Sequence, residues 1–226
     1  MMSFLSGILT CVSCNPTLQN AVFDDRFLGR LLILAAPLPL VAGGIALVVY
    51  AIGKQTQLNG SDRSSAVRTL AAVMTIGVGL GGFVDGIVLH QVLQWHEMFS
   101  NMQPPHTLLD KSVNMFWDGL LHAATWLITF AGLVWLWRLF MRGAAFRANG
   151  LLGGGLLLGW AVFNLVEGTL NHYLFNVHNV REITANPHLF NHAFTVFSIL
   201  LIAAGWWITA RAMRNAQQTA PTQPLL

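Results

Sequence analysis

Two copies of one polar pattern lie inside apolar stretches of the chain that are long enough to cross a membrane. The first copy consists of Asp85, Gly86, His90 and His96. The second copy, 82 residues later, consists of Glu167, Gly168, His172 and His178. Carboxylate and imidazole groups are costly to hold in hydrocarbon, so a duplicated set of them indicates a functional site.

A second helix follows each copy and opens with another spaced pair of polar residues. The first pair is Asp118 and His122, and the second is His188 and His192. Residues four apart share one face of a helix, so each pair can point at one site. The acid and first histidine of each copy are five apart, which rotates them by about 140° in a regular α-helix. They serve one metal ion only if a π-bulge changes the offset. Otherwise the acid supports a ligand from a neighbouring helix.

Imidazole and carboxylate together suit a transition metal such as zinc, iron or copper. The candidate ligands are His90, His122, His172, His192, Asp85, Asp118, Glu167, His96, His178 and His188. The competing interpretation is structural, because histidines can also hydrogen-bond the acids and hold helices together. Duplication of the whole set favours metal binding.

Composition places this set in a membrane protein. Of the 226 residues, 54% are hydrophobic and 9% are charged, whereas soluble domains carry about 25% charged residues. Five stretches are long enough to span a bilayer as helices; they lie near 31–53, 69–93, 113–137, 151–175 and 189–210. Strands of alternating polarity do not occur, so an all-α fold is expected rather than a barrel. The basic pI of 9.3 does not indicate nucleic-acid binding, because the cations gather at helix ends.

The cations also predict an orientation. One set of helix ends carries Lys54, Arg63, Arg68, Arg138, Arg142, Arg147, Arg211 and Arg214. By the positive-inside rule these ends and the C-terminus are cytoplasmic, which fits a multi-pass protein of the bacterial inner membrane. All eight histidines then lie in the outer half or outside it, and His96, His178 and His188 are expected at the rim of the membrane. Arg26 and Arg30 are exceptions, partly offset by Asp24 and Asp25.

The predicted organisation is one transmembrane domain over residues 31–210, with parallel repeats at about 69–137 and 151–210. The last four helices form a four-helix bundle with the first helix outside it. Glycines spaced by four, such as Gly77 and Gly81, place the second and fourth helices at its centre. Residues 1–30 are an N-terminal segment suited to the membrane surface, and 211–226 a disordered tail. The roles of Cys11 and Cys14 stay open.

Three segments resemble an uncharacterised bacterial membrane-protein family, the domain of unknown function numbered 2243. They are Gly81–His96, Trp117–Ala123, and Phe163–Gly168 together with His172. The resemblance covers about residues 66–210. Members of that family are often encoded near cytochrome oxidase assembly factors, which implies copper or haem handling. The pair His188 and His192 also gives a weaker likeness to intramembrane zinc hydrolases of the alkaline ceramidase and adiponectin receptor type.

Four functions follow in order of preference. The first is a membrane metalloprotein acting in metal handling, redox chemistry or assembly of a respiratory partner. The second is a zinc-dependent intramembrane hydrolase with Asp85 or Glu167 as general base. The third is a b-type haem protein with His90 and His192 as axial ligands, although haem iron does not need the buried acids. The fourth, a proton-coupled transporter, lacks ionisable residues in the cytoplasmic half.

Overall fold

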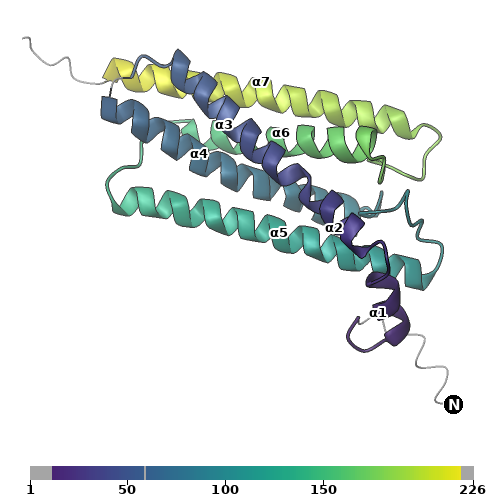
Figure 1. Ribbon diagram of the computed structural model, residues 1–226. Coiled ribbons are helices and arrows are strands. Elements are labelled where there is room, and N and C mark those ends of the chain that lie inside the picture. Colours follow the sequence, from purple (N-terminus) through teal and green to yellow (C-terminus); the bar gives the residue numbers. More distant parts are fainter. Residues whose placement is uncertain (1–11, 59, 220–226) are drawn as a thin grey trace, which may run out of the picture.

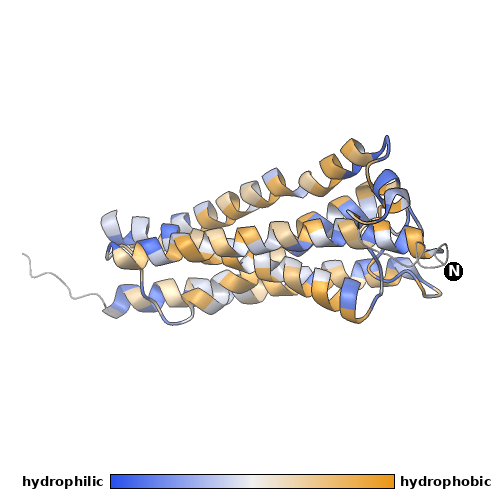
Figure 2. Cartoon of the chain, turned by 90° about the horizontal axis from the view of Figure 1, so that it is seen from below, coloured by the Kyte–Doolittle hydropathy of each residue, from blue (hydrophilic) through white to orange (hydrophobic). Residues whose placement is uncertain are grey.

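The computed structural model describes residues 12–58 and 60–219, and within these ranges all regular structure is helical. Five helical stretches are long and apolar enough to span a membrane: Phe27–Gln55, Gly60–Val92, Leu108–Met141, Leu151–Leu174 and Pro187–Gln218. Figure 2 shows hydrophobic residues along these helices. The structure therefore confirms the five predicted spans and the all-α fold.

Each span contains one or two named elements. The first span consists of α2 (Phe27–Ala35) and α3 (Pro37–Gln55), after the short helix α1 (Pro16–Val22). The second is α4 (Gly60–Phe83), which continues as the π-helix η1 (Val84–Val92). The third is α5 (Leu108–Met141), the fourth is α6 (Leu151–Glu167) with the π-helix η2 (Gly168–Leu174), and the fifth is α7 (Pro187–Thr219).

Helices α4 and α6 form the centre of the bundle. In each of these two spans 61% of the apolar segment is buried, against 11–17% in the other three spans. Glycines allow the contact, since a Cβ atom at Gly159 would lie against the backbone of Met74, and one at Gly77 against the backbone of Leu156. The predicted central pair is therefore correct, and it rests on backbone contact that only glycine permits.

The remaining spans pack around this pair. Helix α5 packs against α4 and α7 packs against α6, while α3 crosses both central helices (Figure 1). Helix α5 begins at Leu108, five residues before the predicted start near 113, because Thr107 and Asp110 form a capping box there.

The first span is interrupted at Ala36, immediately before Pro37. Proline has no N–H group and clashes with the preceding turn, so it begins a new helix rather than continuing the old one. The exceptional cation Arg30 lies in α2 and is buried. Its guanidinium donates to Asp24 Oδ1 at 3.3 Å and to Gln103 Oε1 at 2.6 Å. Its charge is therefore paired inside the protein rather than left in lipid.

The two terminal segments differ in part from the prediction. Within residues 1–30, the buried Leu18 and Val22 of α1 pack into a cluster with Trp117 of α5. This part of the N-terminal segment therefore packs against the helix bundle. Helix α7 continues to Thr219 through part of the predicted tail, because residues such as Ala216 and Gln217 are acceptable in a helix. Cys14 is exposed, whereas Cys11 and residues 220–226 lie outside the described residues.

Candidate metal centre

The π-helices bring the acid and the first histidine of each copy together. Asp85 and His90 lie within η1. His172 lies within η2, which begins directly after Glu167. A π-helix bonds residues five apart instead of four; the Leu93 N–H donates to the Val88 carbonyl at 2.8 Å. The five-residue spacing that separates two side chains on an α-helix therefore places them on one side here. Of the two arrangements that the sequence allowed, the structure has the π-helix.

A reversal after each π-helix returns the second histidine to the interior. Gln94 and Asn176 have φ values of 49° and 48° and are the two non-glycine residues with positive φ in the described parts of the chain. This left-handed conformation ends the helix and turns the chain back. His96 and His178 follow two residues later and are only 3% and 1% exposed. They are buried residues rather than residues of a solvated rim.

Each copy thus forms a compact group of one carboxylate and two imidazoles. We call Asp85, His90 and His96 the first trio, and Glu167, His172 and His178 the second trio. In each trio the three candidate ligand atoms lie within 4.8 Å of one another. All six residues are buried.

The carboxylate of each trio lies close to both imidazoles. In the first trio, Asp85 oxygens lie 3.3 Å from His90 Nε2 and 3.9 Å from His96 Nε2. In the second trio, Glu167 Oε1 lies 3.3 Å from His172 Nε2 and 3.0 Å from His178 Nε2. A tetrahedral metal ion with bonds of about 2.0–2.1 Å spaces its ligands by about 3.3 Å. The trios therefore fit a transition metal in both donor type and spacing.

The two trios adjoin each other. The imidazoles of His96 and His178 stack, with ring centroids 4.5 Å apart. The ring centroids of His90 and His178 are 5.9 Å apart, and those of His96 and His172 are 6.3 Å apart. The four imidazoles and two carboxylates consequently form one continuous polar centre between α4 and α6.

Three of the imidazoles have one ring nitrogen fixed by an acceptor. His90 Nδ1 donates to Asp118 Oδ1 at 2.8 Å. His96 Nδ1 donates to the Val180 carbonyl at 2.9 Å, and His178 Nδ1 donates to the Met98 carbonyl at 2.9 Å. Carbonyl and carboxylate oxygens accept, so each of these Nδ1 atoms carries a proton, and in the neutral form of the ring the lone pair is on Nε2. This is the arrangement that metal-binding histidines usually show.

In that neutral form, Nε2 lone pairs face carboxylate oxygens. His178 Nε2 faces Glu167 Oε1 at 3.0 Å, and His90 Nε2 faces Asp85 Oδ2 at 3.3 Å. Two lone pairs at this distance repel, so a cation is needed between them: a proton on the ring, or a metal ion. The buried Nε2 atoms of His90, His96 and His172 have no hydrogen-bond partner. Buried polar atoms are usually bonded, so these nitrogens are available as ligands of a cation.

Burial also favours neutral imidazole at the second histidine of the first trio. It lowers the pKa of His96 well below the usual 6.5, and the neighbouring histidines act in the same direction. A neutral ring is the form that binds a metal.

A comparison with known protein families shows to which family the chain belongs. Residues 72–212, which include both trios, match the family described as predicted membrane protein (DUF2243). The chain belongs to this family. No curated protein and no solved structure matches it. The likeness to intramembrane zinc hydrolases therefore has no support, whereas the membrane family suggested by the motifs in α4, α5 and α6 is confirmed.

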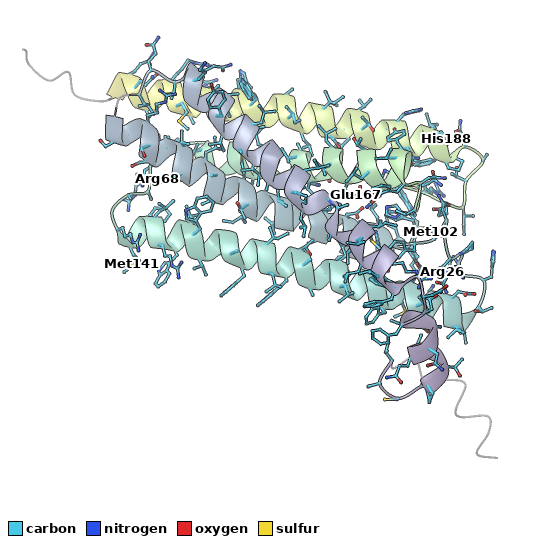
Figure 3. The ribbon with its side chains drawn as sticks, in the orientation of Figure 1. Arg26, Arg68, Met102, Met141, Glu167 and His188 are labelled. Atoms are coloured by element: carbon cyan, nitrogen blue, oxygen red, sulfur yellow. The ribbon has the colours of Figure 1, made fainter. Side chains whose placement is uncertain are left out.

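The other predicted site residues of this DUF2243 protein lie outside the trios. His188 and His192 are exposed, and His192 Nδ1 lies 3.0 Å from the Tyr173 hydroxyl. Figure 3 shows His188 at the start of α7, beyond Glu167 toward the same end of the molecule. His122 is half-buried, and a Cβ atom on Gly86 would lie 2.6 Å from its unpartnered Nε2. Asp118 is buried and supports His90. The structure thus joins the six residues of the duplicated copies. Asp118 of α5 contacts this group through His90, whereas His188 and His192 of α7 are exposed.

Two backbone carbonyl groups that orient histidines of the centre cannot be predicted from the sequence pattern. The Met98 and Val180 carbonyls are backbone atoms, so their role is invisible in residue types. Their own N–H groups donate to Asp118 Oδ1 at 3.0 Å and to Asn191 Oδ1 at 2.9 Å. Asp118 of α5 and Asn191 of α7 therefore occupy equivalent positions in the two halves. The spacing of the polar pairs had instead aligned Asp118 with His188.

Replacing Asp118 with asparagine tests the support of His90. The amide cannot reproduce a carboxylate that accepts from His90 Nδ1, the Met98 N–H and Gln91 Nε2. We expect metal affinity to fall by about 10- to 100-fold, as for other residues that orient metal ligands. Competition with a chromophoric chelator measures this. Asp110→Asn, on the same helix but in its cap, is the control; an equal loss in both variants would contradict the role of Asp118.

Proposed function

We propose that this protein is an integral membrane metalloprotein that binds transition-metal ions through its two trios. The observation that carries the proposal is the close approach of imidazole Nε2 atoms and carboxylate oxygens in both trios, while the buried Nε2 atoms of three histidines have no hydrogen-bond partner. A purely structural hydrogen-bond network would instead need a second proton on each ring whose Nδ1 already donates. The trios have room for one ion each, so the centre is expected to hold two.

The ligand set narrows the choice of metal. Two histidines and one carboxylate form the facial triad of non-haem iron sites and also occur in catalytic zinc sites. Both types keep coordination positions open for a further ligand. Copper(II) also accepts imidazole and carboxylate. Haem is disfavoured, because His90 is buried in the first trio while its suggested axial counterpart His192 is exposed.

The role that fits best is metal handling, redox chemistry or assembly of a respiratory or metal-handling partner in the membrane. A zinc hydrolase is a weaker candidate, since its general base must stay free of the metal. Asp85 and Glu167, the two suggested bases, both lie within ligand distance of the histidines of their trios.

We place the protein in the inner membrane of a bacterium, with the metal centre toward the outer face and the C-terminus in the cytoplasm. The support is the distribution of charge. The π-helices η1 and η2, which carry trio residues, end the spans that α4 and α6 begin, and Figure 3 shows Arg68 at the end opposite to Glu167. An excess of lysine and arginine marks cytoplasmic loops.

Labelling of single cysteines tests this orientation. In a background with Cys11→Ser and Cys14→Ser, we expect Ala185→Cys to react with a membrane-impermeant maleimide in intact cells. Ser61→Cys should react only after the cells are opened. Both positions are exposed, at opposite ends of the spans. Reversed labelling would place the metal centre on the cytoplasmic side.

Elemental analysis and a visible spectrum of the purified protein test the function itself. We expect about two equivalents of iron, zinc or copper per chain and no Soret band, since each trio can hold one ion. A Soret band would indicate haem. Protein that contains no metal, and that binds none after incubation with each ion, would leave the trios as a hydrogen-bonded structural network.

A further inference from the structure

A cavity lies directly beside the candidate metal centre. It is bounded by the interrupted first span, by α4 and α5 and by the end of α6, and its volume is about 200 Å³. Most of its wall is apolar, with Leu34, Val41, Val78, Leu121 and Phe163 among the lining residues. This apolar part of the wall cannot pair with a charged group, and burying an unpaired charge is very costly.

One part of the cavity wall is polar and belongs to the metal centre. Asp85, Glu167, Asn171 and His178 all line it. Three buried oxygens of these residues have no hydrogen-bond partner: Asp85 Oδ1, Glu167 Oε2 and Asn171 Oδ1. A carboxylate or amide oxygen can only accept. The polar part of the wall can therefore accept hydrogen bonds from a donor in the cavity.

The cavity also reaches toward the lipid. Leu31 and Leu38, on either side of the interruption at Ala36, line the cavity and are 37% and 48% exposed. The same residues of the first span thus contact both the cavity and the surface that faces the bilayer. A molecule dissolved in the membrane can approach the carboxylates along this side without crossing the polar loops.

We infer that this cavity binds an uncharged, membrane-soluble molecule that carries a hydroxyl group, with the hydroxyl placed against the carboxylates of the two trios. An apolar cavity of about 150 Å³ accommodates benzene, so the present one suits a substituted ring or a short branched chain. The inference deepens the proposed function, on which it rests: it names the class of molecule that a metal bound in the trios would meet.

The hydroxyl distinguishes this ligand from others of equal size. A phenol or alcohol donates to the unpartnered oxygens, whereas an ether of the same shape leaves them without a donor and adds another acceptor. Loss of a hydrogen bond to a charged group costs about 1.5–3 kcal/mol, which corresponds to about 10- to 100-fold in affinity.

The test compares 4-ethylphenol with 4-ethylanisole on the full-length protein in lipid nanodiscs. Saturation-transfer NMR measures binding, with empty nanodiscs to subtract partitioning into lipid. We expect 4-ethylphenol to bind about 10- to 100-fold more tightly than the ether. Ala124→Phe fills the cavity from α5 and should abolish binding, while Ala123→Phe, at the adjacent exposed position, should not. Ala35→Phe fills the cavity from α2 and serves if Ala124→Phe does not fold.

Equal binding to the Ala124→Phe and Ala123→Phe variants would overturn the inference, as would equal affinity for the phenol and the ether. Measuring metal content in the same samples separates the two proposals. Protein that binds metal but not 4-ethylphenol contradicts the ligand class alone. Protein that binds 4-ethylphenol but no metal contradicts the metalloprotein and leaves the cavity as a binding site for phenols.

Discussion

The double variant His90→Ala/His172→Ala is expected to lose both metal ions, whereas each single variant loses one. Each substitution removes one of the three ligands of its trio, and in both trios the removed Nε2 lies 3.3 Å from the carboxylate. Weakening a residue that merely orients a ligand costs about 10- to 100-fold in affinity, so loss of a ligand should exceed this. Inductively coupled plasma mass spectrometry of the purified protein measures the content.

The matched control for this experiment is His188→Ala/His192→Ala. It removes the same number of imidazoles, but from exposed positions on α7. We expect it to keep the full metal content. Circular dichroism verifies that all variants remain helical. If the double variant of the trios keeps its metal while the α7 variant loses it, the centre lies at the pairs on α5 and α7 and the trios are structural.

The second large effect is expected at the contact between α4 and α6. Gly159→Ala places a Cβ atom against the carbonyl oxygen of Met74, and this backbone cannot move without separating the helices. Overpacking costs about 1–3 kcal/mol where side chains can adjust; here the obstacle is main chain, so we expect a loss of about 3 kcal/mol or more. Unfolding by steric trapping in bicelles measures it.

Gly153→Ala is the control because the space around that position of α6 is open. It should change stability little. The Gly159→Ala variant should also bind metal more weakly, because α4 and α6 each continue into the π-helix that holds one trio. A stable Gly159→Ala variant with full metal content would show that the helices can separate without disturbing the centre.

Much of the fold follows from patterns that the sequence states directly. Long apolar stretches identify the spans, and glycines such as Gly77 and Gly159 identify the two helices in closest contact. The duplicated Asp85 and Glu167 motifs mark the two spans that carry the acids. These predictions succeed because hydrophobic length and the absence of a side chain have few structural alternatives in a membrane.

The geometry of the candidate centre is harder to predict from the sequence. The five-residue spacing raised the π-helix as one of two arrangements, but a spacing cannot choose between them. The reversals at Gln94 and Asn176 depend on a positive φ in residues that are not glycine. Asn adopts this conformation more often than most residues, but Gln gives no such signal. The sequence therefore placed His96 and His178 at the rim, although they are buried.

The alignment of α5 with α7 shows a different limit of what the sequence predicts. The motifs aligned Asp118 with His188, but the bonds from Met98 and Val180 align it with Asn191, three residues later. A shift of three residues is almost one helical turn. The same helix face is therefore presented in both registers, and only the loop contacts distinguish them.

The bonds between the two loops have a consequence for biosynthesis. His96 is held by the Val180 carbonyl, and Val180 is in turn held by Asn191 of α7. During synthesis from the N-terminus, the ligands of the earlier half are complete in sequence but lack the partner that orients them until the final span has entered the bilayer. We therefore expect metal to be acquired only after translation ends, and truncated chains that lack α7 to accumulate without it.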